Sequence, residues 1–143
     1  MGFKKILYNI KKEGVKEMIS IDRRDFLKIR DILERREHCS IKFSGETFLK
    51  TRVILKGDIT ELYMVSQGND LIIRRINLKN TRKGTGTLII KELLELCKRK
   101  GFTRLVVESA LSGEMILLCK KMNFIKESDD FDIGEFGNYF KNV

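Results

Sequence analysis

The stretch that decides the fold is "NTRKGTGTLIIKELLELCKRKG", residues 80–101. It begins with glycines and threonines beside two cations and continues as an amphipathic run. Apolar residues recur in this run at helical spacing: Ile89, Ile90, Leu93, Leu94, Leu96 and Cys97. Gly101 is placed to end it. The pattern predicts a helix from about residue 85 to 100, preceded by a glycine-rich loop.

The loop in front of this predicted helix has the properties of an anion site. A helix N-terminus presents unpaired backbone N–H groups and a partial positive charge. Gly84 and Gly86 would permit positive φ and a close approach of the backbone, while Arg82 and Lys83 add positive charge. We therefore expect a phosphate group to bind here. A glycine-rich turn without a ligand is the alternative.

The two commoner nucleotide loops do not fit the spacing. A P-loop needs G-x-x-x-x-G-K-[ST], and no Gly-Lys-Ser/Thr follows a glycine at that distance. A dinucleotide fingerprint needs G-x-G-x-x-G, but Ile89 stands at the third position, and the segments before the loop have the pattern of an antiparallel meander rather than of a βαβ unit. The expected phosphate ligand is therefore of another class.

Short segments rich in β-branched and aromatic residues precede the loop. They are "IKFSG", "TRVILKG", "ITELYMVSQG" and "DLIIRRINL", and glycine-containing turn signals separate them. This pattern predicts an antiparallel meander. Further upstream, a helix is expected from about residue 22 to 38, with Ser20 or Asp22 as its cap. Residues 3–19 remain open between a strand with a helix, a broken helix and a basic arm.

Three further elements are expected after the helix. "TRLVVESAL" has the apolar character of a strand buried on both faces. "SGEMILLCKKMNF" predicts a short helix with Ser112 as its cap, and "FGNYFKNV" supplies a closing strand. The predicted order is α, βββ, α, β, α, β. Since no proline, linker or repeat marks a boundary, residues 1–143 are expected to form a single domain.

Composition limits the classes of protein and site. No apolar run approaches the about 18 residues that a membrane span requires, and the N-terminus lacks signal-peptide features, so we expect a cytoplasmic protein without a membrane partner. Cys39, Cys97 and Cys119 are odd in number and without C-x-x-C spacing, which predicts reduced thiols. With His38 as the single histidine, no metal site is expected.

The net charge of +9 concerns partners rather than the fold. It favours phosphate-bearing ligands, nucleic acid or an acidic surface without choosing among them. Basic stretches at 3–16, 23–36 and 74–83 suggest a nucleic-acid-binding module or an RNA-directed enzyme. The aromatic content of 8% is not interleaved with these stretches, which argues against a base-stacking surface.

Residues 76–86, "INLKNTRKGTG", with the strand "LVVESA" and the helix ending "CKKMNF", resemble the acyl-CoA-binding core of the GNAT superfamily of N-acyltransferases. The resemblance covers about residues 45–125. It implies an α/β (α+β) fold with a mixed, mostly antiparallel central sheet flanked by helices, and with splayed strands at the acetyl-CoA site. Gly84 and Gly86 match the small positions of the family's Q/R-x-x-G-x-G/A loop, whereas Thr81 takes the first position.

The resemblance also implies how coenzyme A would bind. The loop amides would hold its pyrophosphate, and the preceding strand would pair with its pantetheine arm. Arg74 and Arg75 break the alternation of that strand, as an inserted bulge residue would. The expected cofactor-binding residues are Ile76, Asn77, Leu78, Arg82, Lys83, Gly84, Thr85, Gly86, Thr87 and Ser112.

Three catalytic candidates follow. Family members often use a carboxylate or a water chain as base and a tyrosine on the last helix as acid. Here Cys119 aligns with that tyrosine, and Tyr139 on the last strand is the other candidate acid. Glu108 is the candidate base, because a carboxylate in an otherwise apolar strand should have a partner or a raised pKa. Glu61 is expected to serve in a salt bridge or at the surface.

The expected function is transfer of an acetyl group from acetyl-CoA to a primary amine of a small molecule, protein or peptide. The acidic tail "KESDDFDIGEFGNYF" would favour a cationic amine such as a polyamine or lysine, or would simply form an acidic surface loop. One alternative is a GNAT-like domain that binds coenzyme A but has lost catalysis. The nucleic-acid-binding module is the other, and a homodimer is left open.

Overall fold

The computed structural model describes residues 18–46, 48–81, 83–110, 112–127 and 134–143. Its helices are η1 (Arg23–Phe26), a short 3₁₀ turn, then α2 (Leu27–Glu37), α3 (Thr85–Lys100) and α4 (Gly113–Lys121). Its strands are β1 (Lys42–Ser44), β2 (Arg52–Lys56), β3 (Glu61–Gln67), β4 (Asp70–Asn77), β5 (Arg104–Ala110), β6 (Ile125–Lys126) and β7 (Gly137–Asn142). The meander thus has four strands where the predicted order counted three, and β6 was not predicted. The expectations for residues 3–17 lie outside the described residues.

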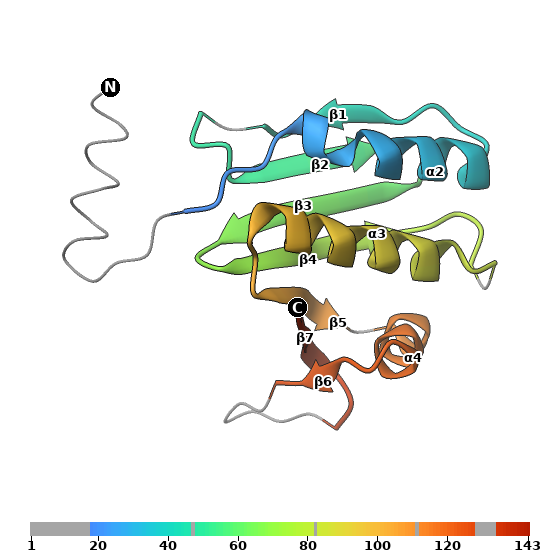
Figure 1. The fold of residues 1–143 in the computed structure, drawn as a ribbon. Helices are drawn as coiled ribbons and strands as arrows, with labels where there is room; N and C mark the ends of the chain where they lie inside the picture. Colours follow the sequence, from blue (N-terminus) through green and yellow to red (C-terminus); the bar gives the residue numbers. More distant parts are fainter. Residues whose placement is uncertain (1–17, 47, 82, 111, 128–133) are drawn as a thin grey trace, which may run out of the picture.

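The strands form one sheet in the order β1-β2-β3-β4-β5-β7-β6. Neighbouring strands are antiparallel except β4 and β5, which are parallel and are connected through α3. Helices α2 and α3 lie side by side across one face of the sheet, and the end of α2, the start of α3 and α4 lie on the same side of the molecule (Figure 1). The predicted mixed, mostly antiparallel sheet flanked by helices is confirmed.

Local sequence signals account for the helix boundaries. Asp22 is the cap at the start of the first helical segment, where its side chain accepts a hydrogen bond from the Arg24 N–H and Asp25 completes a capping box. Gly84 and Gly101 flank α3 in the left-handed conformation, and the Gly101 N–H donates to the Cys97 carbonyl. No helix within the described ranges has the length and apolar character to cross a membrane.

The sheet is interrupted where β4 leaves β5. Tyr63 pairs with Arg75 and Met64 pairs with Ile73, so Arg74 is an extra residue and forms a bulge in β4. The pairing of β4 with β5 ends at Ile73 and Val107. Beyond these residues the two strands separate. The predicted bulge and the predicted splay are therefore both confirmed.

Candidate functional site

Two adjoining cavities extend from the glycine-rich loop to the gap between β4 and β5. The first, of about 340 Å³, lies between the loop, the start of α3 and α4. The second, of about 200 Å³, lies between the separated ends of β4 and β5. They share Ile76, Ser112 and Met115 in their walls. We call the pair the cleft.

Most of the predicted cofactor-binding residues line the cleft. The first cavity is lined by Ile76, Leu78, Gly84, Gly86, Thr87 and Ser112, and the second also by Asn77. Thr85 is buried at the start of α3 and Lys83 is exposed in the loop, so neither side chain forms part of the wall. Arg82 lies outside the described residues. The fold therefore collects residues from β4, the loop, α3 and α4 around one space.

The two glycines of the loop have different roles. Gly84 has a φ of +81° and is the cap of α3, as the expected positive φ requires. For Gly86 that expectation is wrong, since Gly86 lies inside α3 and has no positive φ. A Cβ atom at Gly86 would lie 2.8 Å from Cδ2 of Leu118. Gly86 therefore allows α4 to pack closely against the start of α3.

The candidate base lies at the inner end of the cleft. Oε1 of Glu108 lies 3.2 Å from Nε of Arg74 and Oε2 lies 3.5 Å from its Nη2, so the partner that a carboxylate in this strand needs is the bulge residue. Burial lowers the pKa of Arg74, and the hydrogen bonds and charge of Glu108 and Tyr63 more than offset it, so the pKa is raised. Glu108 also lines a third cavity, of about 560 Å³.

This third cavity, the rear cavity, opens on the face of the sheet opposite α2 and α3. Its wall includes Ile72 and Val106, which alternate along β4 and β5 with the core residues Leu71, Ile73, Leu105 and Val107. The polar side chains in its wall include Asp70, Arg104, Glu108, Glu127 and Asn138. Glu108 belongs to the walls of both the rear cavity and the cleft.

The two candidate acids do not line the cleft. Cys119 is 1% exposed within the core, and burial raises the pKa of its thiol to about 12. Tyr139 is also buried, and its hydroxyl donates a 2.6 Å hydrogen bond to the Glu135 carbonyl. Neither side chain belongs to the walls of the cleft or the rear cavity. The expected salt-bridge role of Glu61 is confirmed, because it pairs with Arg75 at 3.0 Å.

Three residues near the loop were missed in the sequence. Lys121 of α4 contributes to the wall of the first cavity. Arg36, near the end of α2, donates to the Lys83 carbonyl and to Oγ1 of Thr85. Glu37 is completely buried beside the loop. The burial of Glu37 could have been predicted from the sequence, because Ile29, Leu33 and Glu37 follow at intervals of four on the apolar stripe of α2.

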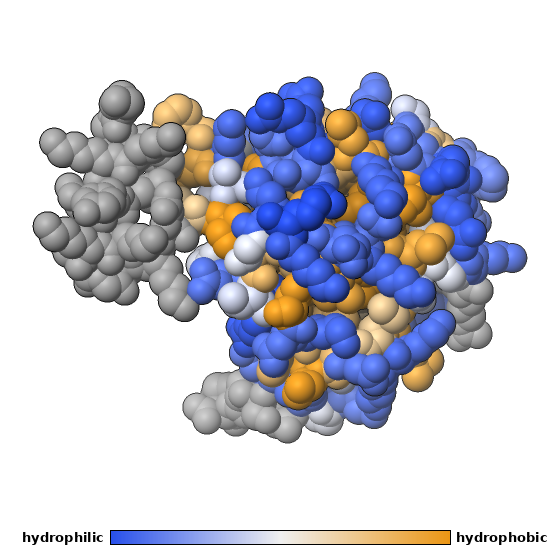
Figure 2. Space-filling view, in the orientation of Figure 1, coloured by the Kyte–Doolittle hydropathy of each residue, from blue (hydrophilic) through white to orange (hydrophobic). Residues whose placement is uncertain are grey.

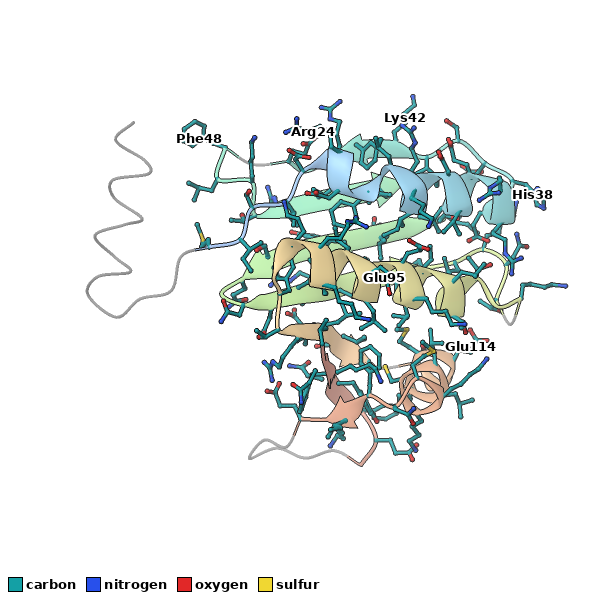
Figure 3. The ribbon with its side chains drawn as sticks, in the orientation of Figure 1. Arg24, His38, Lys42, Phe48, Glu95 and Glu114 are labelled. Carbon is teal, nitrogen blue, oxygen red and sulfur yellow. The ribbon has the colours of Figure 1, made fainter. Side chains whose placement is uncertain are left out.

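Metal-ligating side chains are not gathered at any point of the described ranges. No group of three or more His, Cys, Asp or Glu residues there could hold a metal ion. His38 is exposed at the end of α2, on the side of the molecule where Glu114 lies in the first turn of α4 (Figure 3). Cys39, Cys97 and Cys119 are free thiols, as predicted.

Part of the basic stretch 23–36 is paired with carboxylates, whereas the stretch 3–16 lies outside the described residues. Arg23, Arg24 and Lys28 form ion pairs with Glu46, Asp22 and Glu92, respectively. The face that carries α2 and α3 is mostly hydrophilic, with scattered apolar patches (Figure 2). These pairs reduce the positive charge that Arg23, Arg24 and Lys28 could offer to a phosphate backbone.

Comparison with solved structures identifies the fold. No family model matches the sequence, and neither does any curated protein. The PaiA N-acetyltransferase from Thermoplasma acidophilum, crystallised with coenzyme A, superposes with a TM-score of 0.53 at 19% identity. An acetyltransferase from Bacillus subtilis, also in complex with coenzyme A, gives 0.50 at 13% identity. The chain has the GNAT fold.

The extent of the match differs between these two proteins. It covers 65% of this chain and 62% of the PaiA chain, less than two thirds of the latter, against 73% of this chain and 99% of the Bacillus protein. At such identities the likeness shows the GNAT fold and no more. The cleft therefore has to be interpreted from its own residues.

Proposed function

We propose that the protein binds acetyl-CoA and transfers its acetyl group to a primary amine. One observation carries this proposal: a continuous cleft extends from a helix N-terminus suited to phosphate to a gap in the sheet where a carboxylate stands. The GNAT fold of the chain and the coenzyme A in both neighbouring structures support it.

The outer end of the cleft fits a pyrophosphate. Gly84 and the first turn of α3 direct backbone N–H groups outward, and the helix dipole adds partial positive charge. Lys121 faces the same cavity from α4, and Arg36 lies beside the loop. Anionic oxygens would thus meet both N–H donors and side-chain cations.

The middle of the cleft fits an extended amide-bearing chain. Residues 75–77 of β4 pair with β3 on one side, while β5 no longer pairs with them on the other. Their free backbone groups can therefore form hydrogen bonds with the pantetheine arm as an added strand would. Ile76 and Leu78 supply apolar wall on either side of Asn77.

The inner end supplies a base. Bound acetyl-CoA would bring an activated thioester, whose acyl carbon accepts the amine nitrogen as the C–S bond breaks. Glu108 would accept the proton that the amine loses, and Arg74, which donates hydrogen bonds to it, would orient its carboxylate. The amine would enter through the rear cavity, which Glu108 shares. The leaving thiolate would take its proton from water, because Cys119 and Tyr139 lie outside the walls.

The rear cavity favours a polar or cationic amine. Its wall holds three carboxylates: Asp70 and Glu127 pair with Arg104 of the same wall, and Glu108 pairs with Arg74. The carboxylates thus exceed their arginine partners by one. Of the five acidic residues of the tail at 126–140, which suggested a polyamine or lysine acceptor, the three at 129–132 lie outside the described residues. Glu127 belongs to this wall, and Glu135 pairs with Lys120. An acceptor with a second positive charge would be attracted by this wall.

The second candidate is a coenzyme A-binding domain without catalysis. It is favoured by one observation, namely that neither candidate acid lines the cleft. Calorimetry with acetyl-CoA followed by an assay of free thiol separates the two functions. Acetyl transfer predicts binding and thiol release that depends on an added polyamine, lysine or peptide amine. Binding without release across that panel would favour the inactive domain, and no binding at millimolar acetyl-CoA would exclude both.

A further inference from the structure

We infer that Glu37 is the positioning residue of the phosphate loop, and that it holds residues 79 and 80 in place from the end of α2. This inference rests on the proposed function in one respect, since it assumes that the loop binds the phosphates of coenzyme A. The hydrogen bonds between Glu37 and residues 79 and 80 are present in the ligand-free protein.

The environment of Glu37 is unusual for a carboxylate. Its exposure is 0%, and among the described residues no lysine, arginine or histidine forms an ion pair with it. Burying such a group is costly unless hydrogen-bond donors surround it. Three donors do so here. The N–H of Lys79 lies 2.6 Å from Oε1, that of Asn80 lies 3.0 Å from Oε2, and Oγ1 of Thr60 lies 3.0 Å from Oε1.

These bonds fix the point where the chain leaves β4 and enters the loop. Lys79 and Asn80 follow the strand closely, and their N–H groups both point to one carboxylate. A loop segment that donates two successive N–H groups to a buried acceptor has little freedom to rotate. The direction in which the chain leaves Lys79 and Asn80 is thereby set.

Arg36 completes the hold at the other end of the loop. Its guanidinium donates to the Lys83 carbonyl and to Oγ1 of Thr85 at 3.3 Å, and the Asn80 side chain donates to the Arg36 carbonyl at 3.3 Å. Two consecutive residues of α2 therefore hold both ends of the loop. A loop fixed before its ligand arrives loses less conformational entropy on binding, which strengthens binding.

A negative charge beside a phosphate site would by itself oppose binding. If Glu37 were only a structural acceptor, its neutralisation would leave the affinity for coenzyme A unchanged, or would raise that affinity by removing a negative charge. A positioning residue predicts the opposite, a loss of affinity on neutralisation. The sign of the effect therefore distinguishes the two roles.

Glu37→Gln tests the inference, because it keeps the shape but presents an NH₂ group to one of the three donors. In the ligand-free protein we expect amide exchange at Lys79 and Asn80 to accelerate at least about tenfold, as loss of a hydrogen bond to a charged group implies. The Kd for coenzyme A should rise about tenfold by the same reasoning. The kcat at saturating acetyl-CoA should change by less than about threefold, since no reacting group is touched.

Glu34→Gln is the matched control. Glu34 lies one turn earlier on α2 and accepts a backbone N–H from Ile41 at 2.9 Å, away from the loop. It should alter exchange at Ile41 and leave the Kd for coenzyme A unchanged. If Glu37→Gln fails to fold, Thr60→Val removes one donor while retaining the carboxylate, and should weaken binding about two- to threefold.

Unchanged exchange at residues 79 and 80, or unchanged affinity in a folded Glu37→Gln protein, would overturn the inference and leave the proposed function intact. A parent protein that protects these amides but does not bind coenzyme A would refute the proposed function and leave the hold of Glu37 on the loop standing.

Discussion

The two ends of the cleft are built in different ways. At the outer end, the loop is held by Glu37 and Arg36 of α2, begins α3 at a left-handed Gly84, and lies against α4 through Gly86. At the inner end, the ion pair of Arg74 with Glu108 has side chains 39% and 34% exposed, respectively. The outer end is thus an exposed loop whose backbone is fixed by a buried acceptor, Glu37, and the inner end depends on two half-exposed side chains.

This difference predicts that substitutions at the two ends of the cleft impair different steps. A backbone site fails when the chain path is altered, and it then loses binding. A side-chain site fails when one functional group is removed, and it then loses rate. Substitutions at the two ends should therefore separate Kd from kcat.

The largest effect is expected from Gly84→Val combined with Gly86→Val. Valine is strained at the positive φ of Gly84, and any Cβ at Gly86 meets Leu118. Binding of coenzyme A, measured by calorimetry, should weaken more than about 100-fold through loss of the N–H site. Gly86 also packs against α4, so Gly86→Ala is made as a control, both alone and together with Leu118→Ala, which removes the side chain that the new Cβ would meet. Retained affinity in the folded double valine variant would refute this placement of the pyrophosphate.

Glu108→Gln should show the opposite pattern. The kcat should fall about 100- to 1000-fold, as expected for removal of a general base, while the Kd for acetyl-CoA changes by less than about twofold. Glu61→Gln is a matched control, since Glu61 also pairs with an arginine of β4 but does not line the cleft. Equal kcat values for the two variants in the thiol-release assay would remove Glu108 from the mechanism.

The sequence predicts the local features of the cleft but not the contacts between distant residues. The bounds of α3 and the bulge at Arg74 were predictable, because helical periodicity and broken alternation are local signals. The pairing of Arg74 with Glu108 spans 34 residues and arises only when β4 and β5 align. Glu37 was overlooked although it lies on the apolar stripe of α2. Its donors come from a turn and a loop that no local pattern connects to it.

Arg74→Gln should give an intermediate effect. It retains a hydrogen-bond donor for Glu108 but removes the charge that orients the carboxylate. We expect kcat to fall about tenfold, in line with loss of one charged hydrogen bond, with the Kd for acetyl-CoA little changed. Arg75→Gln, which loses the partner of Glu61 instead, provides the comparison. If both variants lowered kcat equally, general disturbance of the bulge would be the better explanation.

Cys119→Ala should have the smallest effect on rate, with kcat within about threefold of the parent, because the thiol lies in the core outside the cleft. A fall in kcat comparable to that of Glu108→Gln would restore Cys119 as the acid.

The same thiol makes stability depend on pH. Burial raises the pKa of Cys119 from 9.0 to about 12, so the unfolded chain loses this proton first as the pH rises. The free energy of unfolding should therefore fall between about pH 9 and 12, by about 1.4 kcal/mol per pH unit for this thiol. Urea denaturation of the parent and of Cys119→Ala across this range measures the difference, and parallel curves would contradict a buried thiol.

The most direct test is a crystal structure of the protein with coenzyme A. The account predicts the pyrophosphate against the backbone N–H groups of residues 84–87, the pantetheine arm along residues 76–78, and the sulfur in the gap between β4 and β5 beside Glu108. Coenzyme A bound on another surface, or a cleft left empty at saturating coenzyme A, would contradict it.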